Sequence, residues 1–146
     1  FFQMDLAGYR ASFDKLWGYT NVVRLGAEHL SDDGNIVLVS GAPARRAKPG
    51  QAAIASVGGA VEQFVRAVTA ELAPKRINVV SPGVIDTPMF GNDADARAKM
   101  LGGATAKNLI PRAGTPEEVA EGIMFVVKNG FVTGTTIDVD GGWILS

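Results

Sequence analysis

The fold is decided by the stretch Arg76-Ile77-Asn78-Val79-Val80-Ser81-Pro82-Gly83-Val84-Ile85-Asp86-Thr87. Its first half predicts a buried strand, and the strand runs directly into a Pro-Gly turn and a hydroxyl-bearing loop. In an open α/β sheet, ligands bind beyond the carboxyl ends of the parallel strands. A sharp turn with free backbone donors at that place is therefore a candidate binding edge.

Helical and strand patterns alternate on both sides of this stretch. The helices are predicted over residues 6–30, 51–72, 93–101 and 116–128, and the further strands over 36–39 and 135–139. Asn92 is the expected cap of the short third helix, and Thr115-Pro116-Glu117-Glu118 is a strong start signal for the last one. This order predicts a single domain over residues 1–146, an α/β protein with a doubly wound parallel sheet.

Two features of the predicted helices and loops call for an explanation. Gly58 and Gly59 lie inside the second helix and together cost about 2 kcal/mol of helix propensity relative to Ala. Something must favour tiny side chains there, and the close approach of another helix or of a ligand is expected. The polar, Gly-rich segment 89–111 is expected to form a mobile flap around the short helix.

The composition excludes several classes of partner. The chain has 146 residues, 47% of them hydrophobic and 20% charged, with a net charge of -1 and no basic stripe, so nucleic acid is not an expected partner. It contains no cysteine, and no apolar run approaches the roughly 20 residues that cross a bilayer. We therefore expect no disulfide, no thiolate metal site, no membrane partner and a cytoplasmic location. Because the chain begins with Phe1, it is expected to be a processed, truncated or incomplete polypeptide.

Together with Gly134-Thr135-Thr136-Ile137-Asp138-Val139-Asp140-Gly141-Gly142, the opening stretch resembles the short-chain dehydrogenase/reductase family. The family pattern Pro-Gly-x-x-x-Thr is met by Pro82, Gly83 and Thr87. The resemblance implies an NAD(P)-dependent oxidoreductase with NAD or NADP as its cofactor and no metal. It implies a cofactor edge made of Ser40, Pro82, Gly83, Val84, Ile85 and Thr87.

In that edge, the resemblance implies that backbone groups around Val84 and Ile85 hold the carboxamide, while the Thr87 hydroxyl approaches the carboxamide or the phosphates. The resemblance covers nearly the whole chain, but only the carboxyl-terminal part of a family member. The Gly-x-x-x-Gly-x-Gly turn of the family's first βαβ unit does not occur in the sequence. The first βαβ units are therefore expected to be absent from this chain.

The family's catalytic residues are replaced at the positions where the resemblance places them. Its Ser falls on Gly41, next to Ser40, and its Tyr-x-x-x-Lys falls on Ile54 and Gly58. Its relay Asn falls near Gly18; Asn21 lies about one turn away and is not assigned the role. The two tyrosines, Tyr9 and Tyr19, lie on the first helix, and we name no catalytic residue.

Other ionisable residues have an ordinary structural interpretation. His29, near a helix end, is expected to be a surface or capping residue. Asp138 and Asp140 are expected to be solvated or turn-forming rather than an acid-base or metal pair. For Arg45, Arg46 and Lys48, a solvated loop is preferred to contact with a phosphate or an acidic substrate.

Two functions stay open at this point. One is an oxidoreductase with an atypical active site and an unknown substrate, and the alternative is a catalytically inactive relative that binds a nucleotide or serves assembly. The resemblance also implies a homo-dimer or homo-tetramer. Small residues of the second helix, from Ala52 to Ala60, would permit close helix packing, and Trp143, Ile144 and Leu145 are expected in the core or at a subunit contact.

Overall fold

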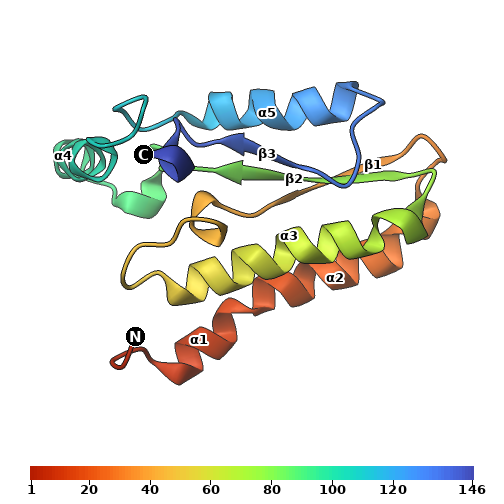
Figure 1. Ribbon diagram of the computed structural model, residues 1–146, viewed down its shortest axis with the longest axis horizontal. Coiled ribbons are helices and arrows are strands. Elements are labelled where there is room, and N and C mark those ends of the chain that lie inside the picture. The colour runs from red at the N-terminus through yellow and green to blue at the C-terminus, as the bar shows by residue number, and fades with distance from the viewer.

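A computed structural model describes all residues from Phe1 to Ser146. Its centre is a three-stranded parallel sheet in the order β1-β2-β3, formed by Asn35–Val39, Arg76–Pro82 and Thr136–Val139. The register places Val39 opposite Val80, and Ser81 opposite Asp138. The sheet confirms the predicted parallel α/β architecture, and the carboxyl ends of the strands lie together at one edge (Figure 1).

Helices cover both faces of this sheet. Helices α2 (Asp14–Gly26) and α3 (Ala52–Leu72) lie on one face, and α5 (Pro116–Lys128) lies on the other (Figure 1). Helix α4 (Ala94–Thr105) stands beyond the carboxyl ends of the strands, and the short α1 (Leu6–Ser12) leads into α2. Single 3-10 turns complete the chain: η1 (Ala27–His29), η2 (Ala42–Ala44), η3 (Pro88–Phe90) and η4 (Trp143–Leu145).

The main core lies between the sheet and the α2/α3 layer. Its buried residues are Val23, Leu38, Val61, Val65, Ile77 and Val79. Residues such as Val61 and Ile77 are fully buried, and each such side chain contributes about 1.5–3 kcal/mol of burial free energy. Strand β2 is buried on both faces from Ile77 to Ser81, as expected for the central strand of a covered parallel sheet.

Polar groups of β2 fix the segment that joins α5 to β3. The Arg76 guanidinium donates to the carbonyls of Val126, Asn129 and Val132, and it thereby caps the open carboxyl end of α5. Asn78 is fully buried, donates to Val132 O at 2.9 Å, and accepts from the backbone N–H of Thr135. These bonds hold β3 against β2 in the observed register.

The predicted helix over 6–30 is wrong in its continuity. The helix is interrupted at Phe13, where the backbone N–H bonds to Arg10 O in a tightened turn and the Ser12 hydroxyl donates back to Tyr9 O. Gly18 lies inside α2 without breaking it. A second correction concerns α4, whose cap is Asp93, not Asn92, because the Asp93 carboxylate accepts from the N–H of Ala96.

The predicted starts of α3 and α5 are confirmed within a residue. Helix α5 carries a complete capping box, since Thr115 and Glu118 each accept a hydrogen bond from the other's backbone N–H. Gly58 of α3 is explained by η2, because a Cβ there would lie 3.0 Å from the Cβ of Ala44, whereas a Cβ on Gly59 would meet nothing closer than 3.9 Å. The element that approaches Gly58 is a turn of the same chain.

Candidate active site

The candidate site lies at the carboxyl edge of the sheet, where Ser40, Pro82 and Asp140 end or follow the strands. Gly83 makes this edge possible, because its N–H donates to Val139 O at 3.0 Å and the two chains touch. A Cβ at position 83 would lie 2.7 Å from both Cα and O of Asp140, so only glycine fits. The resemblance singled out this glycine, and its place in the structure gives the packing reason for it.

The turn after β2 presents unpaired backbone donors. Val84 O accepts from the N–H of Gly114, and the N–H of Asp86 donates to Gly114 O, both at 2.9 Å. These two bonds fix the turn against the segment that leads into α5, while the N–H groups of Val84 and Ile85 have no partner within the protein. The hydroxyl of Thr87, which precedes η3, also makes no hydrogen bond. Pre-positioned donors of this kind can hold a carbonyl oxygen without a cost in side-chain entropy.

A hollow of about 290 Å³ opens beside this turn. Its lining combines apolar side chains of the turn with polar groups from the start of α5 and the end of β3: Val84, Ile85, Ile110, Arg112, Gly114, Glu118, Asp138, Val139, Asp140, Gly141 and Gly142. The lining is mixed, with four hydrophobic residues among the eleven and four charged ones, and convergent polar groups can orient a small ligand. Val84 and Ile85 line this hollow, whereas Ser40 and Thr87 do not.

A buried carboxylate lies behind the carboxyl edge. Glu62 is 3% exposed, accepts from the Ser40 hydroxyl at 2.9 Å, and meets the Arg45 Nε at 3.5 Å. Arg45 also holds Asp138 with both of its terminal nitrogens, one of them 2.9 Å from Oδ2. Arg66, on the next turn of α3, reaches Glu62 at 3.7 Å. We call Ser40, Glu62, Arg45 and Asp138 the edge network; it connects β1, α3, η2 and β3.

The edge network covers a buried hydroxyl without a partner. Ser81 is fully buried, lies opposite Asp138 in the sheet, and its Oγ makes no hydrogen bond. Because the N–H of Ser40 donates to Val80 O, Ser40 lies across from Ser81 on the other side. Buried hydroxyls are normally bonded, so the unpaired Ser81 is an exception. Ser40, Ser81 and Asp138 form a polar row across all three strands. The sequence analysis missed Glu62 and Ser81. For Glu62 a signal was present, because this acidic residue directly follows the apolar Val61 in the predicted helix.

The positions that should carry the family's chemistry hold no ionisable group. Gly41 has an extended backbone, and Ile54 is 51% exposed. Gly58 is buried against η2. Tyr19 donates its hydroxyl to the carbonyl of Val39, the last residue of β1, at 3.4 Å. Tyr9 stacks edge-on against Phe13 at 5.5 Å, and Asn21 is exposed.

The basic loop after β1 is engaged with the rest of the protein. Arg46 donates to Trp143 O at 2.7 Å, and the Trp143 indole N–H donates to Arg46 O at 3.1 Å. The Lys48 ammonium lies 3.7 Å from the Trp143 ring centroid, a cation–π contact that buries the indole. Residues 45–50 are exposed, as expected for a solvated loop, and the cations of this loop also fasten the segment around Trp143 to η2. Asp140 forms a turn as expected, accepting from the N–H groups of Gly142 and Ile144.

One ion pair frames the hollow. Arg112 donates to both carboxylate oxygens of Glu118, at 2.6 and 2.9 Å. These hydrogen bonds, with that of the Thr115 backbone, lower the pKa of Glu118 to about 2, and they raise the pKa of Arg112. Glu118 therefore stays ionised at neutral pH and cannot serve as a proton donor there. His29, by contrast, lies far along the chain in η1, exposed beside Glu28.

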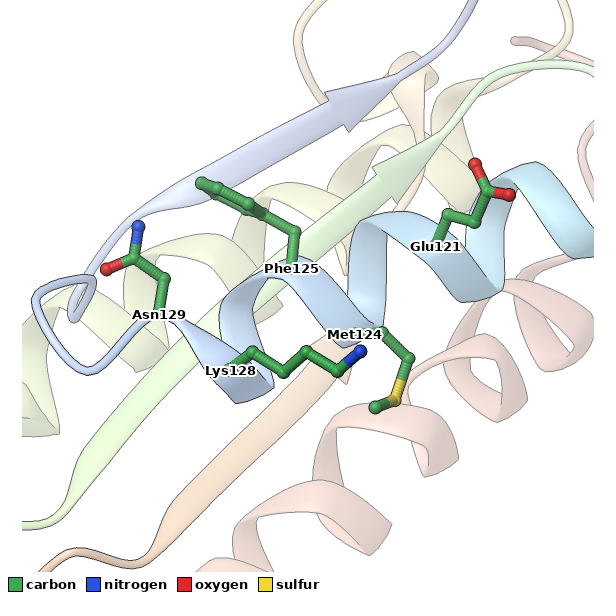
Figure 2. A pocket seen from close by; sticks show the side chains of 5 residues that line it. All are labelled: Glu121, Met124, Phe125, Lys128 and Asn129. Carbon is green, nitrogen blue, oxygen red and sulfur yellow. The ribbon is translucent and has the colours of Figure 1, made fainter.

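A second hollow, of about 410 Å³, lies on the outer side of α5 and is lined by Glu121, Met124, Phe125, Lys128 and Asn129. Figure 2 shows that Met124 and Phe125 point to opposite sides of the helix, so the side chains do not converge on one point. No helix of the protein is both long and apolar enough to span a lipid bilayer. His, Cys, Asp and Glu also form no group of three or more that could hold a metal ion. The carboxyl edge of the sheet is thus the candidate site.

Parallel strands, helices on both faces and a Pro-Gly turn with free donors define an α/β protein of the doubly wound, nucleotide-binding type. Residues 1–144 match the family model described as enoyl-(acyl carrier protein) reductase. The chain belongs to the short-chain dehydrogenase/reductase family.

Relatives and solved structures agree with this assignment. The chain is 39% identical over 111 residues to the short-chain dehydrogenase/reductase ATR9 of Stachybotrys chlorohalonatus, covering 76% of this chain and 44% of that protein. It is 41% identical over 116 residues to the cyclopentanol dehydrogenase of a Comamonas species, covering 75% and 45%. A crystal structure of a small-chain dehydrogenase in complex with NADPH superposes with a TM-score of 0.92 at 32% identity, covering 99% of this chain and 67% of that one. The chain thus spans under half the length of these two named relatives.

Proposed function

We propose that this chain forms part of an NAD(P)-dependent oxidoreductase with an atypical active site, acting on a small carbonyl or alcohol substrate. The observation that carries the proposal is the turn after Pro82-Gly83, where the N–H groups of Val84 and Ile85 are fixed in place but unpaired. Family membership and the NADPH bound to a similar structure support the same cofactor class. A bound nicotinamide would supply the hydride.

The residues of this chain fit the nicotinamide half of such a cofactor. A carboxamide oxygen can accept from the two free N–H groups, and the unengaged Thr87 hydroxyl offers a further bond. Pro82 and Gly83 set the turn, and Gly83 brings it against β3. The Ser40 hydroxyl donates its proton to Glu62, so toward a ligand it can act only as an acceptor. The choice between NAD and NADP is left to the binding experiment.

The test is isothermal titration of the complete protein with NADH and NADPH, followed by hydride-transfer assays on a panel of carbonyl compounds. Thr87→Val removes a hydroxyl that bonds to nothing in the protein, and we expect it to weaken cofactor binding by about threefold to tenfold. Thr136→Val, at the amino end of β3, is the matched control and should leave binding unchanged. Absence of binding of either cofactor to the complete protein would end the proposal.

The second candidate function is a catalytically inactive relative that binds a nucleotide or serves assembly. The hydrocarbon side chain of Ile54 and the glycines at positions 41 and 58 favour this function, because carbonyl reduction requires a proton donor at the oxygen and none of these residues is one. Under this hypothesis the protein binds cofactor without turnover. The combined changes Gly41→Ser, Ile54→Tyr and Gly58→Lys, with Ala44→Gly to make room for the lysine, create turnover from none. Turnover by the unmodified protein would refute it.

We also infer a homo-dimer or homo-tetramer. Apolar side chains of the α2/α3 layer face outward, with Trp17, Val22 and Leu25 each at least 65% exposed. Large exposed apolar patches are typical of interaction surfaces. Light scattering coupled to size-exclusion chromatography measures the mass, and a monomer at micromolar concentration would contradict the inference.

A further inference from the structure

The candidate site lacks its expected cation. The lysine of the family would fall on Gly58, where η2 fills the space in front of α3. The other cations near the edge have partners: Arg45 holds Glu62 and Asp138, and Lys48 covers Trp143. These cations are therefore already paired and are not available to the oxygen atoms of a ligand.

Lys15 lies at this edge and has no acidic partner. It comes from the start of α2, and its ammonium donates a single long hydrogen bond, 3.4 Å, to the backbone carbonyl of Ser40 just past the end of β1. The Tyr19 ring lies one turn further along the same helix, with its centroid 5.7 Å from the ammonium. No carboxylate lies within 4.0 Å of Lys15, which distinguishes it from Arg45, Arg97 and Arg112.

Lys15 is an exposed residue, so its ammonium is accessible to a ligand. Partial desolvation lowers the pKa of Lys15 below the ordinary lysine value, and no opposite charge offsets that effect. A ligand oxygen, above all an anionic one, would supply the missing partner and raise the pKa again. The hydrogen bond from Lys15 to the Ser40 carbonyl is weak, because it is long and its acceptor is uncharged. A ligand oxygen can therefore replace this carbonyl or bind the ammonium beside it.

We propose that Lys15 is the ligand-binding cation of this site, donating hydrogen bonds to oxygen atoms of the nicotinamide ribose or its phosphate in place of a lysine at position 58. This inference rests on the proposed function, since it requires a bound nicotinamide nucleotide. It assigns the role to a different helix, α2. The Tyr19 ring and hydroxyl would orient the stem of Lys15, as a positioning residue.

The experiment measures the acylation rate of Lys15 in the complete protein by peptide mass spectrometry, with and without NADPH. Lys128, the last residue of α5 and at the opposite end of that helix from the hollow, is the internal control. We expect NADPH to slow acylation of Lys15 at least fivefold and to leave acylation of Lys128 unchanged. If NADPH binds by calorimetry and Lys15 reacts at its original rate, the inference is overturned while the proposed function stands. If no cofactor binds, both fail.

Two further arms define the contact. Nicotinamide riboside carries only the ribose hydroxyls, whereas nicotinamide mononucleotide adds the phosphate, so protection by the second alone assigns the phosphate. Protection by neither, with NADPH protecting, would overturn the assignment to the nicotinamide half. Lys15→Met should weaken NADPH binding about tenfold to a hundredfold, and Lys15→Arg should recover most of it. Lys128→Met is the matched variant, and equal thermal midpoints of the variants exclude misfolding as the cause.

Discussion

Replacing Arg45 by methionine tests whether the edge network holds the carboxyl edge together. The change removes the main cation from Glu62, which is 3% exposed, and from Asp138, whose side chain is 28% exposed. Breaking a buried ion pair costs about 3–5 kcal/mol, because the remaining charge is left without compensation. Arg45 itself is 32% exposed, and Glu62 keeps the Ser40 hydroxyl and the more distant Arg66. We therefore discount the cost to about 2 kcal/mol, most of it from Glu62.

Urea denaturation at neutral pH measures this loss, with an unchanged slope against denaturant concentration. For a chain of this size, about 2 kcal/mol corresponds to a fall in Tm of about 4–8 °C. The double variant Arg45→Met, Glu62→Met removes the uncompensated charge and should recover at least half of the loss. Arg66→Met is the control, since Arg66 is half exposed and 3.7 Å away, and it should cost under about 0.5 kcal/mol. A loss for Arg45→Met no larger than this control would refute the reasoning.

Three further outcomes are expected. Gly83→Ala places a Cβ 2.7 Å from the backbone that follows β3 and should lower the free energy of unfolding by about 1–3 kcal/mol. Gly41→Ala meets only contacts of 3.6 Å or more and should leave it nearly unchanged. Urea denaturation of the two variants measures the difference. The ion pair of Glu118 stabilises the fold fully above the unperturbed pKa of 4.5, and this stabilisation is lost as the pH falls through about 2. A carbon NMR titration of the Glu118 carboxylate should therefore have its midpoint near 2, and the midpoint should move to higher pH in Arg112→Met. Gly59→Ala, with its nearest contact at 3.9 Å, should raise the free energy of unfolding by about 0.5–1 kcal/mol, and a loss of stability would contradict the open space seen there.

Local rules made much of the fold predictable. The start of α5 depends on Thr115 and Glu118, which bond to each other's backbone within one turn, and such signals need no tertiary information. The apolar run of β2 likewise requires cover on both faces, which a central parallel strand has. The sequence did not predict the break at Phe13, because the apolar spacing continues across this residue. The break is visible only in the backbone hydrogen bonds around Phe13.

The candidate site was only partly predictable, for a topological reason. The Pro82-Gly83 turn carries a contiguous motif, and its place beyond a parallel strand follows from the fold. The edge network joins residues up to 98 positions apart, from Ser40 to Asp138, and no local pattern relates them. The same holds for Lys15, which meets the end of β1 only because α2 packs beside it.

The glycine at position 58, where the resemblance places the family's lysine, and the edge network are parts of one packing arrangement. Because position 58 is glycine, η2 can approach α3 until Ala44 would lie 3.0 Å from a Cβ there. That approach brings Arg45, the next residue, within reach of Glu62 one turn along the helix. A lysine at position 58 would push η2 outward and pull Arg45 away from its carboxylates. Gly58→Lys should therefore destabilise the protein unless Ala44→Gly accompanies it, and restoring the family's chemistry requires both changes.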